Sequence, residues 1–540
     1  MHRFLSLIGK TLRRRYYLLT AILVFLSFPS FDTPLLKGFP VFAWFCLVPL
    51  FLAARRRGYK RLYLASFFTF LPAALFTWGW MGSFGGNTFE GHLVIWALLL
   101  PCIAFLFAGR VLAAEFLSRR YPAFRVFIYP SIWLLGDLIQ SLGYLAFPWN
   151  YLGYSQYPVL PFVQASSVIG ILGVSFLIAA GNTIIAEFIA ANRTSVLSLK
   201  LHPKSLVWKK VPAAFLAVIV LITAAGTIRL LNGIPKSEKT YRIAAVQSCI
   251  SPWADWERLK YAKLGEIIAM SDRAILPKPD LLVWSESATL EPVSYRARIG
   301  NPDRFDEMIM DYARTKSVPI LTGEIGVIDD PVRMIGCPQN SAVLVDKTGT
   351  IAGDYAKIHL CPFGEWFPYG QLFPWIRDIA LEMGGSDFVP GNTPVKFTAG
   401  GASFGVLICY EGMFFRLPAG YKRMGADFLV NITNDGWSGS YGGHFQHFAA
   451  APFRAAENGM WFIRVGNDGY TAVLDPLGRT TRSIPVMKQG VMNTSIQLGG
   501  ITTIYSLVGD LFSYCILGLC ALLCAIGEIR IFRKRIKRAS

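Results

Sequence analysis

Three side chains that could carry out acyl chemistry follow apolar runs in the second half of the sequence. Cys409 ends ASFGVLIC, Glu286 ends LLVWSE, and Lys357 lies in DYAKIHL. A thiolate can attack a carbonyl, a carboxylate can take the thiol proton, and an ammonium can stabilise the developing oxyanion. Each has an ordinary alternative, because a single cysteine is usually a buried hydrophobe and charged pairs are usually surface salt bridges. Together they make a chemically sensible set for nucleophilic catalysis.

The elements that would position these groups alternate between short β-rich runs and helical stretches, which predicts a layered α/β domain. Strands are expected at 242–247, 281–286, 318–324, 340–346, 404–409, 428–433, 461–465 and 472–474, and helices at 256–271, 302–316 and 443–459. Reactive groups at strand ends lie where such folds expose their chemistry.

The chain as a whole has the composition of a membrane protein, with 53% hydrophobic and 16% charged residues among 540, and the apolar excess lies in the first 230 or so residues and the last 40. Eight segments are apolar enough to cross a bilayer, at 17–34, 38–54, 62–81, 92–117, 126–142, 159–190, 211–230 and 504–526. The sixth is overlong, and Gly170 and Gly173 suggest a kink or a loop within it. The formal charge of +19 comes from basic residues beside these segments. Membrane topology and anionic lipid explain it better than nucleic acid.

The charges of the connecting loops predict the topology. Basic clusters lie at 13–15, 55–61, 119–125, 200–210 and 530–538, whereas 82–91 and 143–158 contain no Lys or Arg. By the positive-inside rule both termini are cytoplasmic, seven spans deliver the polar domain to the outer side, and the eighth returns the chain. The aromatic loop 145–157 suits the membrane interface, and a second interpretation makes it a lipid entrance facing the polar domain.

These patterns divide the chain into three parts. Residues 1–232 are expected to form a seven-helix transmembrane region and residues 240–497 an extracytoplasmic catalytic domain. Residues 498–540 are expected to form a C-terminal transmembrane helix with a basic cytoplasmic tail. No CxxC pair or zinc-ligand spacing is present, so we expect no metal site. The sequence does not decide whether a disulfide joins two of the residues Cys249, Cys337 and Cys361.

The chain resembles the apolipoprotein N-acyltransferase family, integral membrane enzymes that carry a nitrilase-superfamily domain. The matching motifs are LLVWSE (281–286), DYAKIHLCPFGEWFP (354–368), ICYE (408–411), NITNDGWSG (431–439), FQHFAAAPFRAAENG (445–459) and GNDGYTAVLDPLG (466–478). The layout of seven spans before the polar domain and one after it also matches. The resemblance implies a four-layer αββα sandwich beside about eight transmembrane helices, with the site facing the outer leaflet.

The resemblance also implies roles for particular residues. Those matching the family's catalytic and supporting positions are Glu286 (general base), Lys357 (oxyanion stabilisation), Cys409 (nucleophile), Glu365, Tyr410 and Glu411 (around the site) and Trp256 (aromatic contact near the acyl group). Ser285 stands where a proline commonly precedes the glutamate, and Val465 and Gly466 stand where the family often has Ser-Thr. Neither departure removes a reacting group.

The implied reaction moves an acyl chain from a membrane phospholipid to the N-terminal amine of a diacylglyceryl-cysteine apolipoprotein, through a Cys409 thioester. This is a step of lipoprotein maturation. It implies a monomeric enzyme of the bacterial inner membrane, with its catalytic domain in the periplasm. Its partners are phospholipid, diacylated apolipoproteins and the bilayer, and it needs no nucleic acid, cofactor or metal.

Three alternatives compete with this reaction. A membrane-tethered nitrilase or amidase that hydrolyses a small amide would use the same three groups. A Cys-His hydrolase could use His444 or His447 of GGHFQH. A transporter or receptor with an inactive outer domain is opposed by the intact reactive groups and by the expected lack of a charged series inside the spans.

Overall fold

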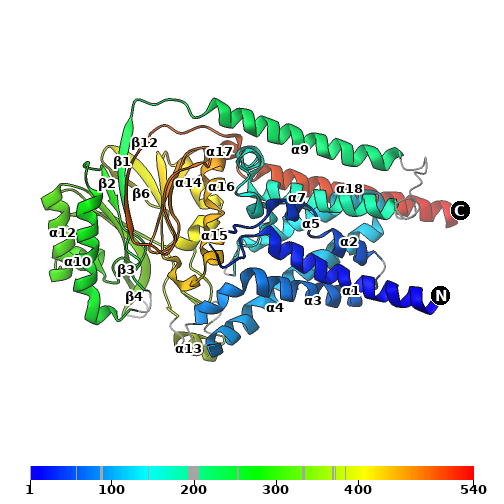
Figure 1. Ribbon diagram of the computed structural model, residues 1–540, viewed down its shortest axis with the longest axis horizontal. Coiled ribbons are helices and arrows are strands. Elements are labelled where there is room, and N and C mark those ends of the chain that lie inside the picture. The colour runs from blue at the N-terminus through cyan, green and yellow to red at the C-terminus, as the bar shows by residue number, and fades with distance from the viewer. Residues whose placement is uncertain are drawn as a thin grey trace.

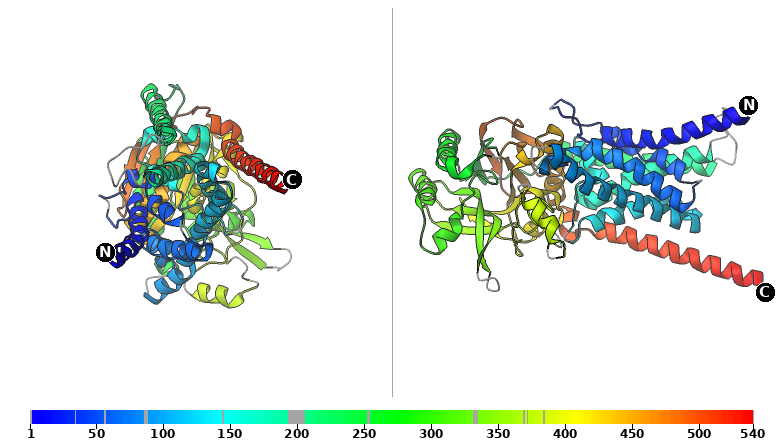
Figure 2. Two further views of the ribbon diagram at one scale, coloured as in Figure 1. Left: turned by 90° about the vertical axis from the view of Figure 1, so that its right-hand side faces the viewer. Right: turned by 90° about the horizontal axis from the view of Figure 1, so that it is seen from below.

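The computed structural model describes residues 2–33, 35–55, 57–85, 89–143, 145–192, 206–251, 254–330, 335–367, 370, 372–382 and 385–539. A helical bundle and an α/β domain lie end to end along the longest axis of the molecule (Figure 1). Both ends of the chain lie at the end of the bundle far from the α/β domain (Figures 1 and 2).

The bundle corresponds to the predicted apolar segments. Its main helices are α1 (His2–Ser27), η1 (Pro40–Trp44) with α2 (Val48–Ala54), α3 (Tyr59–Trp78), α4 (Phe89–Arg120), α5 (Arg125–Gln140), α7 (Ser166–Ala191), α9 (Leu206–Asn232) and α18 (Leu511–Ala539). Among the described residues, six helices are long and apolar enough to cross a membrane. The first two predicted segments are shorter apolar helices, Arg15–Ser27 and Pro40–Ala54. Within the second, a turn at 45–47 separates η1 from α2.

A break in the overlong sixth segment falls at Gly170. A short helix, α6 (Leu160–Val163), precedes α7, and Gly170 near the start of α7 has a φ of 65°. The ring of Tyr505, on α17 (Ile504–Val508), comes within 2.5 Å of the place where a Cβ would stand. Glycine at position 170 therefore avoids both a strained left-handed backbone and a clash with the Tyr505 ring.

Charged side chains lie inside the bundle, which corrects the expectation that the spans lack a charged series. Arg110 of α4 pairs with Asp137 of α5 at 2.6 Å, and both side chains are buried. Nearer the end of the bundle that is far from the α/β domain, Arg125 pairs with Glu115 at 2.5 Å and with Glu187 at 2.8 Å. Each buried charge has an opposite partner on another helix, as charges in a low-dielectric interior require. A scan of single spans cannot see such pairing.

The α/β domain contains two six-stranded sheets. The first, in the order β12-β1-β2-β3-β4-β5, consists of β1 (Thr240–Gln247), β2 (Leu281–Val283), β3 (Ile320–Asp330), β4 (Ile335–Val345), β5 (Ile351–Ala356) and β12 (Gly490–Gln497). The second, in the order β11-β10-β9-β8-β7-β6, consists of β6 (Lys396–Ala399), β7 (Ala402–Ile408), β8 (Phe428–Thr433), β9 (Trp461–Gly466), β10 (Thr471–Leu474) and β11 (Thr480–Ile484). The central triplets β1-β2-β3 and β7-β8-β9 are parallel.

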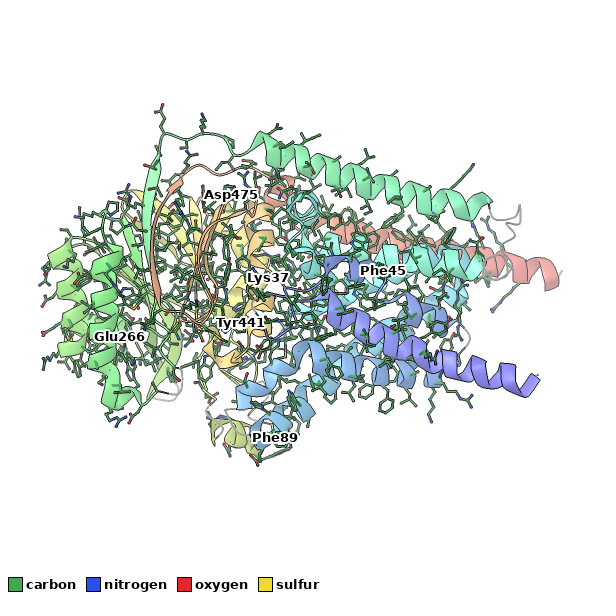
Figure 3. All side chains as sticks on the ribbon, in the orientation of Figure 1. Lys37, Phe45, Phe89, Glu266, Tyr441 and Asp475 are labelled. Atoms are coloured by element: carbon green, nitrogen blue, oxygen red, sulfur yellow. The ribbon has the colours of Figure 1, made fainter. Side chains whose placement is uncertain are left out.

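Helices cover the outer face of each sheet, so the domain is the predicted αββα sandwich. The first sheet is covered by α10 (Trp256–Ala274) and α12 (Arg304–Lys316), and the second by α14 (Arg416–Arg423), α15 (Tyr441–Phe448) and α16 (Ala451–Asn458). The shared core holds fully buried side chains from both sheets, such as Val283 and Val406. The second helix layer faces the bundle, where α16 packs on α7. Figure 3 shows Glu266 on the outer layer and Tyr441 near this junction.

Several elements differ from the prediction. Strand β2 ends at Val283 and β7 at Ile408, so Glu286 and Cys409 follow their strands rather than ending them. The predicted helix at 443–459 is two helices, because Pro452 starts a new one at α16. Strands β5, β6, β11 and β12 were not predicted. They are edge or near-edge strands with many exposed positions, as in β11, and their apolar pattern is weak.

Candidate active site

The ends of three strands bring the predicted reactive groups together. Glu286 lies three residues after β2, Lys357 directly follows β5, and Cys409 directly follows β7. All three line one cavity of about 380 Å³. Two bundle tryptophans, Trp80 and Trp149, line it as well. The cavity thus lies between the sandwich and the bundle.

Two carboxylates share the Lys357 ammonium. Lys357 Nζ donates to Glu365 Oε1 at 2.7 Å and to Glu286 Oε1 at 3.4 Å. The side-chain amide of Asn340 donates to the same two oxygens, at 2.6 and 2.8 Å. The backbone N–H of Asn434 donates to Glu286 Oε2 at 2.7 Å. Asn340 was not predicted, because a single asparagine within a strand, here the middle of β4, has no signature in the sequence.

Burial sets the protonation of these groups. It raises the pKa of Glu286, and Lys357 offsets this only in part. Burial alone would lower the pKa of Lys357, but Glu365 and Glu286 raise it well above its usual value. Burial and the Glu286 carboxylate raise the pKa of Cys409 well above that of a free thiol. The resting thiol is therefore protonated and needs a base, and Lys357 stays cationic.

A second set of buried residues supports the backbone of Cys409, whose φ is 49°. His447 Nε2 lies 3.1 Å from the Cys409 carbonyl oxygen, and the Asn431 side-chain amide donates to it at 3.3 Å. His447 Nδ1 lies 2.7 Å from Asp435, which also accepts from Arg464 at 2.5 Å. Positive φ is costly for a non-glycine residue, so contacts that fix it matter.

This set also bears on the alternatives. Ligand atoms of Cys409, Asp435 and His447 lie within 4.8 Å of one another. However, Arg464 already pairs with Asp435, and a guanidinium at this distance opposes a second cation. Burial and Arg464 lower the pKa of His447, so its ring is neutral near pH 7. His447 was considered only as a rival base, and its contact with the Cys409 carbonyl was not foreseen.

Tyr410 connects the nucleophile to the loop 145–157 of the bundle. Its hydroxyl donates to the Ala146 carbonyl at 2.9 Å, and its ring stacks on Trp149 with centroids 6.1 Å apart. Trp149 and Trp80 both donate to Gln446 of α15, at 3.3 and 3.0 Å. The membrane-side wall of the cavity is therefore fastened to the sandwich by direct hydrogen bonds.

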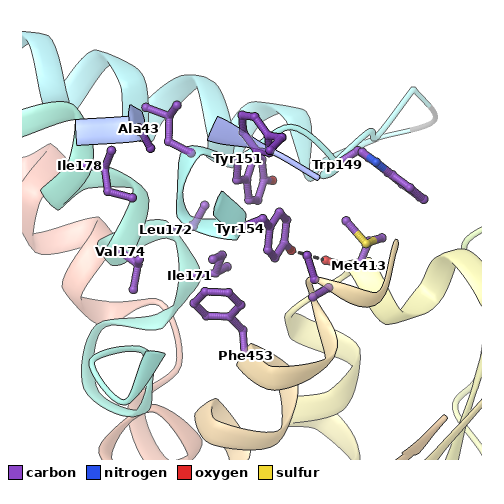
Figure 4. Close-up of a cluster of buried hydrophobic side chains, with 14 of the residues drawn as sticks. Ala43, Trp149, Tyr151, Tyr154, Ile171, Leu172, Val174, Ile178, Met413 and Phe453 are labelled. Atoms are coloured by element: carbon purple, nitrogen blue, oxygen red, sulfur yellow. Dashed lines mark hydrogen bonds between the residues drawn. The ribbon is translucent and has the colours of Figure 1, made fainter. Parts of the chain in front are cut away.

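The same loop makes further contacts with the sandwich (Figure 4). The Tyr154 hydroxyl donates to the Met413 carbonyl at 3.1 Å, and its ring packs against Phe453. Figure 4 shows these side chains within one apolar cluster that includes Ile171 of α7. Loop, bundle and sandwich thus share one core at the junction.

Glu411, which the resemblance places around the site, contacts the backbone beside Lys357 and Cys409. It is fully buried and is not among the described residues that line the cavity. One of its oxygens accepts from the backbone N–H of Ile358 at 2.8 Å, and the other from that of Ile408 at 2.8 Å. These residues adjoin Lys357 and Cys409, so Glu411 ties the two reactive segments together.

Trp256 lines the cavity from the first turn of α10. Its indole N–H donates to Glu291 at 2.9 Å, which fixes the orientation of the ring. Cys361 also lines the cavity. Cys249, Cys337 and Cys361 are all free thiols in the described structure.

Comparison with known proteins decides the family. The model of the apolipoprotein N-acyltransferase N-terminal domain matches residues 20–184, and that of carbon-nitrogen hydrolases matches residues 242–505. Apolipoprotein N-acyltransferase 2 of Treponema denticola is 30% identical over 385 residues, 70% of this chain and 72% of its own. The chain belongs to the apolipoprotein N-acyltransferase family.

Other apolipoprotein N-acyltransferases match over nearly the full length. That of Geobacter metallireducens is 29% identical over 521 residues, 94% of each chain. Apolipoprotein N-acyltransferase 1 of Treponema denticola is 27% identical over 557 residues, 98% of each chain. Among solved structures, an amidase from Nesterenkonia sp. is 19% identical, with a TM-score of 0.35, over 50% of this chain and 93% of its own. The carbon-nitrogen hydrolase match and the six candidate spans, together with the family, make this acyltransferase a multi-pass membrane enzyme of the nitrilase superfamily.

Proposed function

We propose that this enzyme transfers an acyl chain from a membrane phospholipid to the N-terminal amine of a diacylglyceryl-cysteine apolipoprotein. The observation that carries the proposal is a cavity in which Cys409, Glu286 and Lys357 meet behind a wall of bundle tryptophans. Both substrates reside in the bilayer, and such a wall suits acyl chains. The names of the full-length relatives support the same reaction.

In the first half-reaction, Cys409 Sγ attacks the ester carbonyl carbon while Glu286 takes the thiol proton. Proton transfer to Glu286 must accompany the attack, because the raised pKa of Cys409 keeps its resting thiol protonated. Lys357 stabilises the oxyanion of the tetrahedral intermediate. The ester C–O bond then breaks, Glu286 returns the proton to the departing glycerol oxygen, and a lysophospholipid leaves. The acyl chain stays on Cys409 as a thioester.

In the second half-reaction, the free α-amine of the lipoprotein attacks the thioester carbonyl. Glu286 takes a proton from the amine, the C–S bond breaks, and the departing thiolate regains that proton. The product is an amide, and Cys409 returns as a thiol. The covalent intermediate divides one difficult transfer into two easier steps. We assign supporting roles to Glu365, Tyr410, Glu411 and Trp256.

We further propose that both termini are cytoplasmic and that residues 240–497 lie in the periplasm as the catalytic domain. Support comes from the basic segments 57–61 and 119–125, which lie at the end of the bundle that also holds the termini (Figure 1). A reporter fused after residue 540 should be cytoplasmic. A reporter found on the outer side would refute this topology.

The decisive experiment supplies purified enzyme with phospholipid and withholds the acceptor. Intact-mass analysis should then show one acyl group, mapped by peptide analysis to Cys409. Addition of a diacylated lipopeptide should discharge that group onto the peptide amine. An unmodified thiol under conditions that support turnover would contradict the thioester route. Release of free fatty acid without N-acylation would favour the hydrolase alternative.

A further inference from the structure

A chain of buried polar contacts runs from the interior of the bundle to the wall of the cavity. Arg110 pairs with Asp137, with 5% and 0% of their side chains exposed. Arg110 also donates to the side chain of Gln140, whose amide donates to Asn150 at 3.2 Å. Arg110 lies ten residues before the end of α4, about 15 Å along the helix. The chain therefore begins at membrane depth and ends in the loop 145–157.

Two further hydrogen bonds fasten the same loop to the end of α5. The Tyr151 hydroxyl donates to the Asp137 carbonyl at 2.6 Å. The Phe147 backbone N–H donates to the Gln140 carbonyl at 2.6 Å. The loop is thus held at Phe147, Asn150 and Tyr151, on both sides of Trp149.

The opposite side of the loop touches the reactive centre. Ala146 accepts the hydrogen bond from Tyr410, the residue next to Cys409, and Trp149 lines the cavity. Moving the loop would therefore move the cavity wall. It would leave the Glu286 and Lys357 contacts in place, because these come from the sandwich alone.

We propose that Arg110, Asp137 and Gln140 are positioning residues for the acyl pocket. They fix the loop 145–157 so that Trp149 and Tyr410 present a preformed wall to the acyl chain. The inference rests on the proposed function, since a preformed wall matters only if the cavity receives an acyl group. Preorganisation of this kind raises affinity by removing the cost of ordering the wall on binding.

Stability alone is a poor explanation for a charged pair at this depth. Replacing a buried ion pair with packed apolar side chains is often neutral or stabilising, and such pairs serve conformational specificity in some proteins. Charged groups inside membrane helices are rare and mark function by default. Here the hydrogen bonds of Arg110 and Asp137 connect to the loop 145–157, and that loop forms part of the cavity wall.

The test variant is Gln140→Leu, which removes the middle of this series of hydrogen bonds without changing any charge. We expect the KM for phospholipid in thioester formation to rise about tenfold, with kcat changed by less than about threefold. The rate at which iodoacetamide alkylates Cys409, followed by peptide mass spectrometry, should stay within about twofold of wild type. This split separates a displaced wall from a damaged nucleophile.

The matched control is Glu187→Gln. It removes a buried carboxylate of the bundle whose partners are Arg55 and Arg125, and Arg125 keeps Glu115. It should leave the KM unchanged even if the melting temperature falls. Asn150→Ala breaks the same series of hydrogen bonds within the loop. It replaces Gln140→Leu if that variant does not fold, and the same KM increase is expected.

A wild-type KM in Gln140→Leu or, if that variant does not fold, in Asn150→Ala would overturn the inference. So would an equal KM increase in Glu187→Gln, because general loosening of the bundle would then explain the effect. Failure of the wild type to form any thioester would instead overturn the proposed function.

Discussion

Replacing Glu411 with glutamine should loosen the connection between the segments that carry Lys357 and Cys409. The carboxylate accepts four hydrogen bonds: from the Tyr355 hydroxyl at 2.7 Å and from the backbone N–H groups of Ile358 at 2.8 Å, His359 at 3.2 Å and Ile408 at 2.8 Å. Glutamine keeps one oxygen but turns an NH₂ group toward at least one of these donors.

The loss of stability follows from the number of buried hydrogen-bond donors that lose their acceptor at position 411. One buried donor left without an acceptor costs about 1–3 kcal/mol. For a domain of this size that lowers the melting temperature by about 2–12 °C. Glu411→Ala strands all four donors, at least about 4 kcal/mol, which is a large part of a domain's 5–15 kcal/mol. A shift of about 1 Å at the strand ends would also lower the acylation rate about a hundredfold.

The effect should depend on pH. Burial raises the pKa of Glu411 to about 7, whereas an unfolded chain gives about 4.3. The folded state therefore binds more protons between these values, and the wild type loses about 1.4 kcal/mol per pH unit as pH rises through this window. Glu411→Gln has no proton to lose. The stability gap, taken as wild type minus variant, should thus fall by about 2–3 kcal/mol between pH 5 and pH 8.

Tryptophan-fluorescence melts in detergent at pH 5 and pH 8 would measure this gap. Glu266→Gln is the matched control, because that carboxylate is half-exposed on α10 and pairs with Lys263. It should change stability by less than about 0.5 kcal/mol. A gap that widens with pH would refute the assignment of the raised pKa to burial. Lost activity with an unchanged melt would mean that Glu411 acts on the reacting atoms.

Three further substitutions test other parts of the structure. Cys409→Ser should lower N-acylation at least about a thousandfold while membrane insertion is retained, and residual thioester would place the nucleophile elsewhere. Lys357→Met removes the cation that lowers the pKa of Glu286, so the acid limb of the kcat/KM profile should move to higher pH; an unmoved limb would exclude Glu286 as the base. Gly170→Ala should cost about 2–4 kcal/mol in melting experiments, whereas Gly109→Ala, which meets open space, should be near neutral.

The features that the sequence predicts well are those with a local signature. Long apolar segments, alternating loop charges and reactive residues after apolar runs each appear within about 20 residues. Cys409 and Glu286 were placed at strand ends because β7 and β2 are continuous apolar runs bounded by polar residues. The parallel, doubly covered centre of each sheet demands such runs. The roles of these residues remain predictions for the experiments above.

The features that were missed depend on contacts between distant segments. Nothing near Arg464 or Asp435 indicates that they meet behind Cys409, since they lie 29 positions apart, Arg464 in β9 and Asp435 two residues after β8. Arg110 and Asp137 each interrupt an apolar span, and only the packing of α4 on α5 pairs them. Glu411 was expected around the site from the resemblance, but its hydrogen bonds to the segments that carry Lys357 and Cys409 have no local signature in the sequence.

The pairing of β1 with β12 has a consequence for how the molecule is assembled. Thr240 and Gln497 are directly opposite each other in the antiparallel pair, so their Cα atoms lie about 5 Å apart. The polypeptide therefore enters the sandwich at β1 and leaves it at β12 at neighbouring points. The whole sandwich behaves topologically as a single insertion in one membrane hairpin. Because this insertion shares one apolar core with the bundle, replacing it with a short linker between α9 and α17 would expose the face of α7 on which α16 packs.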